Sequence, residues 1–283
     1  MLNREQLLSL VRAALVEDVG SGDATTLAVV PETLLTAAHL VTRQACVCAG
    51  LPVVEALFAE LDSALSFDAF VAEGDRCAAG ATLAVVYGPA RAILTGERTA
   101  LNFLQRLCGV ATLTRRYVDA LGDCPTQILD TRKTTPGWRF LEKYAVRVGG
   151  GQNHRFGLYD RVMIKDNHRE LAKLSGPDSI ARAVAACRAA YPGLEIEVEA
   201  DTLADVRAAA EAKVEYILLD NMSDAEMAQA VLLVAGRARL EASGGITLER
   251  LPGLARLGLD FISVGALTHS APAVDIGLDI MVP

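Results

Sequence analysis

The chain lacks a long apolar segment and has few of the residues that bind transition metals. Among its 283 residues, no uncharged apolar run reaches the length of about 18 that a membrane-spanning helix needs, so no such helix is expected. Only four histidines are present, with no HExxH motif and no His/Cys cluster. A dedicated zinc site is therefore not expected.

The sequence also lacks an export signal and any pairing of cysteines at metal-ligand spacing. Its first 20 residues carry scattered charges and have the pattern of an amphipathic helix, with Leu7, Val11, Ala14 and Leu15 on one face. We therefore expect a cytoplasmic protein with reduced thiols. The six cysteines are Cys46, Cys48, Cys77, Cys108, Cys124 and Cys187.

Positive charge is scarce overall but is concentrated in one place. The chain has a net charge of −8 and a pI near 5.1, which argues against nucleic acid as a general partner. Residues 131–157, the basic segment, contain six Lys/Arg and one acid, so their formal charge is +5 and the remainder carries −13. Such a segment attracts a small polyanionic ligand, and a phosphate backbone is the alternative ligand.

Two parts of the chain differ in pattern. Residues 25–92 alternate and turn often, as expected of short strands joined by Gly and Asp turns. A helix is predicted from Thr95 to about Asp119, because apolar residues recur three and four positions apart. Beyond residue 125, short apolar runs alternate with Ala-rich helical patterns. This alternation is typical of βαβ units with a parallel sheet.

Six such runs are predicted to be strands. Their spacing indicates a barrel or near-barrel, with an open doubly wound sheet as the alternative. The strands are expected at residues 127–130, 161–166, 195–200, 215–221, 239–245 and 260–266.

Most of the predicted strands end in polar residues or glycines. Ligands of parallel α/β folds bind at the carboxyl ends of the strands, so these residues mark a candidate site. Helix capping by Asp or Asn explains one or two of them, but not a Lys and a Glu at the same level. Glu197 and Glu199 share a strand face, and periodicity alone does not separate them. The strand-end residues are Asp130, Lys165-Asp166, Glu199, Asp220-Asn221, Ser243-Gly244-Gly245 and Val264-Gly265-Ala266.

The residue types at this edge point to a phosphorylated sugar and a second anion. The two late glycine turns are suited to phosphate, although an ordinary tight turn explains either one equally well. Glu199 and Asp220 are suited to ribose hydroxyls, directly or through Mg²⁺. Five cationic candidates would pair with carboxylates: Arg132, Lys133, His154, Arg155 and Lys165.

Eight segments together resemble quinolinate phosphoribosyltransferases, also called nicotinate-nucleotide pyrophosphorylases (decarboxylating). The most specific are DTRKTTPG, GGGQNHR and IKDNH. The resemblance implies an α/β fold of the type II phosphoribosyltransferases, an incomplete α/β barrel beside an N-terminal α/β sandwich. The sandwich is expected at 1–110, joined by a C-terminal tail at 271–283, and the barrel at 111–270. The segments span 17–26, 97–112, 130–158, 164–168, 197–203, 217–221, 241–246 and 262–270.

The resemblance also implies a reaction. Quinolinate and phosphoribosyl pyrophosphate would give nicotinate mononucleotide, pyrophosphate and CO₂, with Mg²⁺ as cofactor, in de novo NAD biosynthesis. It implies a homodimer, or a higher oligomer, and neither a nucleic-acid nor a membrane partner. A related transferase with another acceptor, such as nicotinate, and a non-catalytic nucleotide-binding protein on the same fold are the alternatives.

Site residues are carried over from the resemblance one by one. Lys133, Glu199 and Asp220 are expected to serve catalysis, the last two also as Mg²⁺ ligands, directly or through water. Arg98 is expected to enter the partner subunit's site. The remaining substrate-binding candidates are Thr131, Arg132, His154, Arg155, Lys165, Ser243, Gly244, Gly245, Val264, Gly265, Ala266 and His269.

Three points near these motifs stay open or depart from the family. Arg98 is expected in the first turn of its helix, with Thr95 as cap, where a cation is disfavoured. Trp138 stands where the family usually has Leu. The cations Arg139, Lys143 and Arg147 recur four apart, and their role is either structural or supportive of the site.

Overall fold

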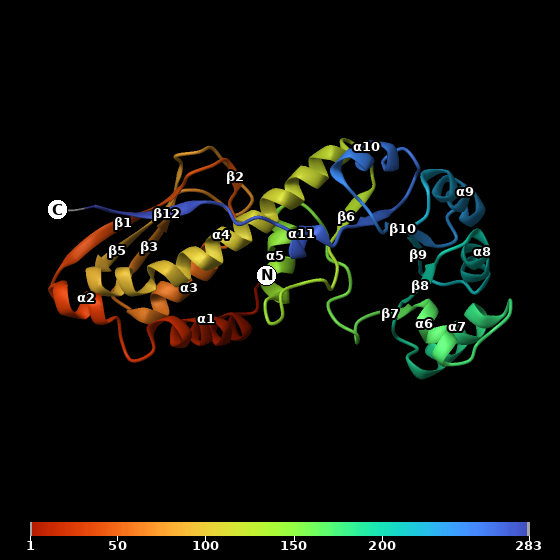
Figure 1. Ribbon diagram of the computed structural model, residues 1–283, viewed down its shortest axis with the longest axis horizontal. Helices are drawn as coiled ribbons and strands as arrows, with labels where there is room; N and C mark the ends of the chain where they lie inside the picture. Colours follow the sequence, from red (N-terminus) through yellow and green to blue (C-terminus); the bar gives the residue numbers. More distant parts are fainter. Residues whose placement is uncertain (1, 282–283) are drawn as a thin grey trace. The chain divides into compact units, whose positions relative to one another are not determined.

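The computed structural model describes residues 2–281, and the last two residues of the expected C-terminal tail lie outside this range. Internal contacts divide the chain into two units (Figure 1). The first unit contains Met1–Arg115, Thr134–Gly150 and Leu267–Pro283, and the second contains Arg116–Lys133 and Gly151–Ala266.

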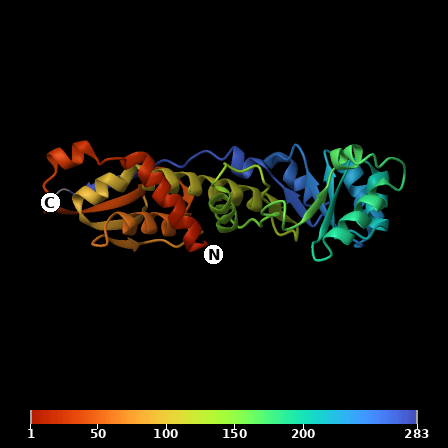
Figure 2. The same ribbon diagram turned by 90° about the horizontal axis from the view of Figure 1, so that it is seen from below.

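A four-stranded antiparallel sheet forms the centre of the first unit. Its strand order is β12-β1-β5-β3, so the last strand of the chain pairs with the first, from Thr42 opposite Ile276 to Ala37 opposite Met281. Figure 2 shows these strands with the first part of a long helix beside them. The strands are β1 (Leu35–Thr42), β3 (Ser66–Ala69), β5 (Thr82–Pro89) and β12 (Ile276–Met281); β2 (Cys46–Val47) and β4 (Arg76–Cys77) form a separate pair.

Helices of this unit follow the predicted apolar patterns, with one boundary error. The N-terminal helix buries Leu7 and Val11, as expected. The long helix begins at Ala90 and not at Thr95, because its apolar stripe extends a further turn toward the N-terminus. Arg98 therefore lies well inside the helix, and the first-turn argument is wrong. The helices are α1 (Arg4–Val19), α2 (Ala24–Val29), α3 (Leu51–Leu61), α4 (Ala90–Leu121) and α5 (Arg139–Val148).

All six predicted parallel strands are present in the second unit. The sheet order is β6-β11-β10-β9-β8-β7, so the strands from β7 to β11 are neighbours in chain order and β6 lies beside β11. β6 and β7 do not pair, which leaves the barrel incomplete. The order runs in one direction from β7 to β11, without the reversal of a doubly wound sheet, and this excludes that alternative. The strands are β6 (Gln127–Leu129), β7 (Val162–Ile164), β8 (Ile196–Ala200), β9 (Tyr216–Asp220), β10 (Arg239–Ser243) and β11 (Phe261–Ser263).

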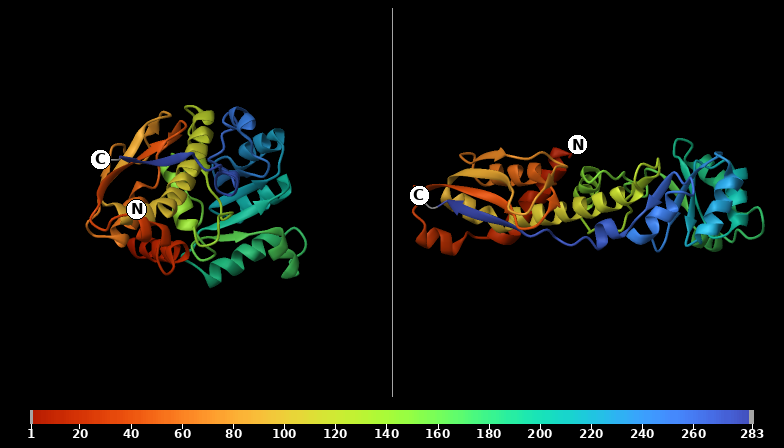
Figure 3. Two further views of the ribbon diagram at one scale, coloured as in Figure 1. Left: turned by 60° about the vertical axis from the view of Figure 1, so that its left-hand side comes forward. Right: turned by 90° about the horizontal axis from the view of Figure 1, so that it is seen from above.

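Helices cover one face of this sheet. α7, α8 and α9 lie along the sheet, and α8 packs against both β8 and β9 (Figure 3). Because helices cover the strands, β9 is a continuous apolar run and not an alternating one. The helices of this unit are α6 (Asp166–Leu171), α7 (Ser179–Ala190), α8 (Leu203–Glu211), α9 (Asp224–Val234), the 3₁₀ turn η1 (Leu248–Arg250) and α10 (Leu251–Leu254). The short helix α11 (Ala266–His269) begins at the last residue of this unit and continues in the first unit.

Two further expectations can be compared with the described residues. Within residues 2–281, no helix combines the length and apolar character required to cross a membrane. All six cysteines lie in this range and are free thiols.

Candidate functional site

A pocket of about 490 Å³ opens within the second unit, at the carboxyl ends of its strands. Each of the six parallel strands supplies at least one lining residue, either near its end or just beyond it. The predicted convergence of strand ends is therefore present. The lining residues are Thr131, Arg132, Lys133, His154, Arg155, Met163, Lys165, Glu199, Leu218, Asp220, Asn221, Glu241, Ser243, Gly244, Gly245 and Ser263.

Most of the candidate site residues line this pocket. Arg98 and His269 belong to the first unit, where both are exposed. Val264, Gly265 and Ala266 follow β11 in the second unit but are not among the lining residues. The candidates that the structure brings together are Thr131, Arg132, Lys133, His154, Arg155, Lys165, Glu199, Asp220, Ser243, Gly244 and Gly245.

The basic segment enters the pocket only at its two ends. Arg132 and Lys133 line it just after β6, and Arg155 lines it before β7. The middle of the segment belongs to the first unit and forms α5. There, Lys143 is buried, and the guanidinium of Arg139 donates a hydrogen bond to Thr134 Oγ1 at 3.0 Å. Only half of the segment's cations therefore face this pocket.

Arg155 is anchored by backbone and sulfur atoms at the edge of the sheet. Its Nη1 donates to the carbonyl of Arg161 at 3.1 Å, and its Nη2 lies 3.7 Å from the sulfur of Met163. Burial and then the charge of Arg132 lower the pKa of Arg155, but a guanidinium stays charged at neutral pH. Two positive charges close to each other are suited to an anionic ligand.

Two carboxylates face the cations from neighbouring strands. Glu199 ends β8 and Asp220 ends β9, and both are partly exposed. Glu199 forms an ion pair with Lys165, and Asp220 accepts a hydrogen bond from Asn221 Nδ2 at 2.9 Å. Glu197 is fully buried beneath Glu199, so Glu199 is the member of this pair that a ligand reaches.

A glycine turn after β10 closes one side of the pocket. Gly244 has φ +87°, and a Cβ there would lie 2.0 Å from Asn221 Oδ1 and 3.1 Å from the Asn221 backbone nitrogen. Gly245 has φ +58° and open space around it. Only glycine fits at Gly244, because a side chain would collide with the turn after β9. The exposed backbone is available to a phosphate.

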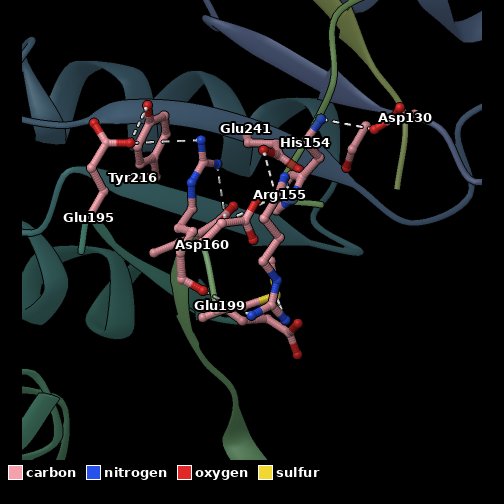
Figure 4. A network of polar contacts seen from close by, with 12 residues as sticks. Asp130, His154, Arg155, Asp160, Glu195, Glu199, Tyr216 and Glu241 are labelled. Carbon is pink, nitrogen blue, oxygen red and sulfur yellow. Dashed lines mark hydrogen bonds and ion pairs between the residues drawn. The ribbon is translucent and has the colours of Figure 1, made fainter. Parts of the chain in front are cut away.

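A buried polar layer lies beneath these residues (Figure 4). Asp130 accepts hydrogen bonds from the backbone of His154 at 2.8 Å and from Asn153 Nδ2 at 2.6 Å. His154 Nε2 lies 3.0 Å from Glu197 and 3.5 Å from Glu241. Asp130, Glu197 and Glu241 are fully buried.

The two buried glutamates are electrostatically different. Burial acts to raise the pKa of Glu197, but the nearby ring N–H of His154 and the guanidinium of Arg161 outweigh it, so this pKa lies below its ordinary value. Burial and the negative charge of Glu197 raise the pKa of Glu241 well above its ordinary value. The pKa values of these two neighbouring carboxyls are therefore shifted in opposite directions.

The lining residues that sequence reasoning missed follow one rule. Met163, Leu218 and Glu241 each lie two positions before a candidate residue on the same strand or its end. Alternate residues of a strand share a face, so counting back two positions from Lys165, Asp220 and Ser243 would have found them. Ser263 ends β11 and was not singled out.

Comparison with known proteins assigns the fold to one family. The model of the quinolinate phosphoribosyl transferase N-terminal domain matches residues 23–108, and that of the C-terminal domain matches residues 110–279. The chain belongs to the quinolinate phosphoribosyltransferase family. The incomplete barrel and the sheet domain of the first unit are the two domains of this family.

Relatives of the family match over nearly their whole length. The probable nicotinate-nucleotide pyrophosphorylase of Bacillus subtilis is 42% identical, covering 99% of this chain and 95% of the relative. A quinolinate phosphoribosyltransferase (decarboxylating) of Nicotiana glauca is 38% identical, covering 97% and 82%. The NadC structure from Streptococcus pyogenes is 42% identical and superposes with a TM-score of 0.93, covering 99% and 98%.

Proposed function

We propose that the protein is a decarboxylating quinolinate phosphoribosyltransferase. It would transfer the phosphoribosyl group of phosphoribosyl pyrophosphate to quinolinate and release nicotinate mononucleotide, pyrophosphate and CO₂, in de novo NAD biosynthesis. The observation that carries this proposal is one pocket with four fixed cations, two reachable carboxylates and a glycine turn. Family membership supports the same conclusion.

The cations answer an electrostatic problem in the proposed reaction. Quinolinate is a dianion and phosphoribosyl pyrophosphate carries more negative charge, so the two repel each other in water. Arg132, Arg155 and Lys165 would bind the carboxylates of quinolinate, the arginines in the bidentate manner that suits a planar carboxylate. Lys133 would lie near the reacting groups, with its backbone N–H held by Thr131 Oγ1 at 3.0 Å.

Bond changes in the reaction require no side-chain nucleophile. The ring nitrogen of quinolinate attacks C1 of the ribose as pyrophosphate leaves, and the ring nitrogen becomes positively charged. The cationic ring then stabilises the electron pair left at C2 as the C2–carboxylate bond breaks and CO₂ leaves, and C2 takes up a proton from water to give nicotinate mononucleotide. The contribution of the protein is position and charge, which together account for large accelerations in other enzymes.

Glu199 and Asp220 fit the requirements of Mg²⁺. Both carboxylates reach the pocket from adjacent strands, and Mg²⁺ in phosphate sites uses one or two carboxylates with substrate oxygens and water. When bound, Mg²⁺ would neutralise charge on the leaving pyrophosphate. Without it, Glu199 is balanced by Lys165, and both carboxylates are available to the ribose hydroxyls. The turn at Ser243, Gly244 and Gly245 would hold the 5′-phosphate.

Binding measurements separate this function from transfer to another acceptor. Nicotinate lacks one carboxylate, and a charge-assisted hydrogen bond contributes about 1.5–3 kcal/mol. Quinolinate should therefore bind about 10- to 100-fold more tightly than nicotinate in isothermal titration. Equal affinity, or tighter binding of nicotinate, would exclude quinolinate as the preferred acceptor.

We also propose a homodimer in which Arg98 serves the partner subunit's site. Arg98 is exposed on α4, and the pocket of the second unit does not include it among its lining residues. Mixing Arg98→Ala and Lys165→Ala chains should restore up to a quarter of the activity, since one dimer in two is mixed and has one intact site. No recovery in dimers that demonstrably exchange would assign Arg98 to its own subunit or to no site.

A cytoplasmic location is proposed on the six free thiols.

A further inference from the structure

His154 lies in the pocket wall, and protein groups lie close to both of its ring nitrogens. Nδ1 accepts a hydrogen bond from the backbone N–H of Arg155 at 2.7 Å. Nε2 lies 3.0 Å from Glu197. It also lies 3.5 Å from Glu241, which Figure 4 shows beside His154. An imidazole nitrogen that accepts an N–H has no proton of its own, so the ring proton belongs on Nε2.

We propose that His154 is held as a neutral imidazole with its only ring proton on Nε2, and that Glu197 is the positioning residue that fixes this tautomer. A doubly protonated ring would lose the hydrogen bond from Arg155. The positive charge of the pocket then comes from Arg132, Lys133, Arg155 and Lys165, and His154 does not add to it. This consequence rests on the proposed function, whereas the tautomer itself does not.

Glu197 is itself fixed from the opposite side. Arg161 Nη1 lies 3.5 Å from Glu197, and its Nη2 lies 3.9 Å from Glu195. The Arg161 guanidinium also stacks 4.0 Å from the centre of the Tyr216 ring. The negative charge of Glu197 is therefore balanced by Arg161, and the imidazole is not needed as a cation. The pocket-facing cation Arg155 extends from the backbone beside His154 toward the level of Glu199 (Figure 4).

Glu241 completes the surroundings of the ring without adding charge. It is fully buried, and a protonated carboxyl there avoids a second buried negative charge beside Glu197. The remaining charged groups around the loop are Asp130, which accepts the His154 backbone N–H, and Asp160, which accepts the backbone N–H of Gly157 at 3.0 Å.

The same geometry argues against a metal in this cluster. His154, Glu197 and Glu241 place three possible ligand atoms within 4.8 Å of one another. However, a histidine that ligates through Nε2 carries its proton on Nδ1, and here Nδ1 accepts a hydrogen bond. Arg161 also lies against Glu197, where it would repel a divalent cation.

Nitrogen NMR of histidine-labelled protein tests the tautomer without substrate. The chain has only four histidines, so His154→Asn assigns the signal by its loss. The two ring nitrogens should keep widely separated shifts from pH 6 to 8, with the proton on Nε2. Glu241→Gln should preserve this pattern, because an amide resembles a protonated carboxyl. Glu197→Gln should bring the two shifts together as the tautomers exchange.

Several outcomes would overturn the proposal. The proposal is wrong if the two ring nitrogens of His154 have nearly equal shifts, as in an imidazolium, in the unmodified protein near pH 7. It is also wrong if the two shifts stay as far apart in Glu197→Gln as in the unmodified protein. Tight Zn²⁺ binding that shifts Nε2 would assign the cluster to a metal instead. The unmodified protein decides the tautomer even where a variant fails to fold. In addition, the Kd for quinolinate should change less than about twofold between pH 6 and 8. A cationic histidine that lost its proton over this range would instead weaken binding roughly tenfold.

Discussion

The two glycines after β10 provide a matched test of the pocket's geometry. Gly244→Ala would place a methyl group 2.0 Å from Asn221 Oδ1 and 3.1 Å from the Asn221 backbone nitrogen, at φ +87°. Gly245→Ala meets open space at φ +58°. A non-glycine residue in the left-handed region costs about 1–2 kcal/mol at either position. Gly244→Ala also displaces Asn221, which breaks its hydrogen bond to Asp220 and adds about 1.5 kcal/mol.

The expected loss of unfolding free energy is therefore about 3 kcal/mol for Gly244→Ala and about 1 kcal/mol for Gly245→Ala. Urea denaturation followed by circular dichroism measures both, and Gly244→Ala should also show the larger rise in KM for phosphoribosyl pyrophosphate. Equal destabilisation by the two alanines, or a Gly244→Ala protein as stable as the parent, would refute the close approach between the turns after β9 and β10.

Three further predictions concern single side chains. Lys165→Ala should raise the KM for quinolinate about 10- to 100-fold, because it removes a charge-assisted hydrogen bond of about 1.5–3 kcal/mol. The control variant Lys173→Asn, at an exposed position, should leave this KM unchanged. Trp138→Leu removes the ring stack on Phe103, whose centroid distance is 4.7 Å. The free energy of unfolding, measured by urea denaturation, should therefore fall by about 1–2 kcal/mol, while the KM for quinolinate stays unchanged. Asp23 caps α2, and hydrogen bonds from Thr26 lower the pKa of its carboxyl. The parent should therefore be more stable than Asp23→Ala above pH 4, and this difference in stability should shrink as the pH falls through the lowered pKa. A difference that persists unchanged at pH 2.5 would contradict the role of the charged cap.

The parallel sheet was the part of the fold most accessible from sequence. Each strand is a short apolar run that ends in a polar residue or glycine, and its period differs from that of the Ala-rich helices. The start of α4 was missed because Thr95 has the character of an N-cap, whereas the helix continues from β5 through Ala90 without a break. Ala90 and Ile93 are buried and continue the apolar stripe in front of Thr95, so the stripe marks the start of this helix better than the capping residue does.

The candidate pocket was partly predictable for a related reason. Lys165, Glu199 and Asp220 stand at strand ends, where local pattern and topology agree. The basic segment is continuous in sequence, but its middle folds as α5 in the first unit. Fewer of its cations therefore line the pocket than its total charge suggested. The raised pKa of Glu241 depends on burial and on Glu197, which lies on another strand, and the local sequence predicts neither.

Release of labelled CO₂ tests the central claim most directly. Quinolinate labelled in its 2-carboxylate is incubated with the protein, Mg²⁺ and phosphoribosyl pyrophosphate, and labelled CO₂ and nicotinate mononucleotide are counted. The account predicts one CO₂ for each mononucleotide, no release without phosphoribosyl pyrophosphate, and a large loss of turnover in Lys165→Ala at low quinolinate. Absence of CO₂ from a folded protein, or mononucleotide formed from nicotinate but not from quinolinate, would contradict it.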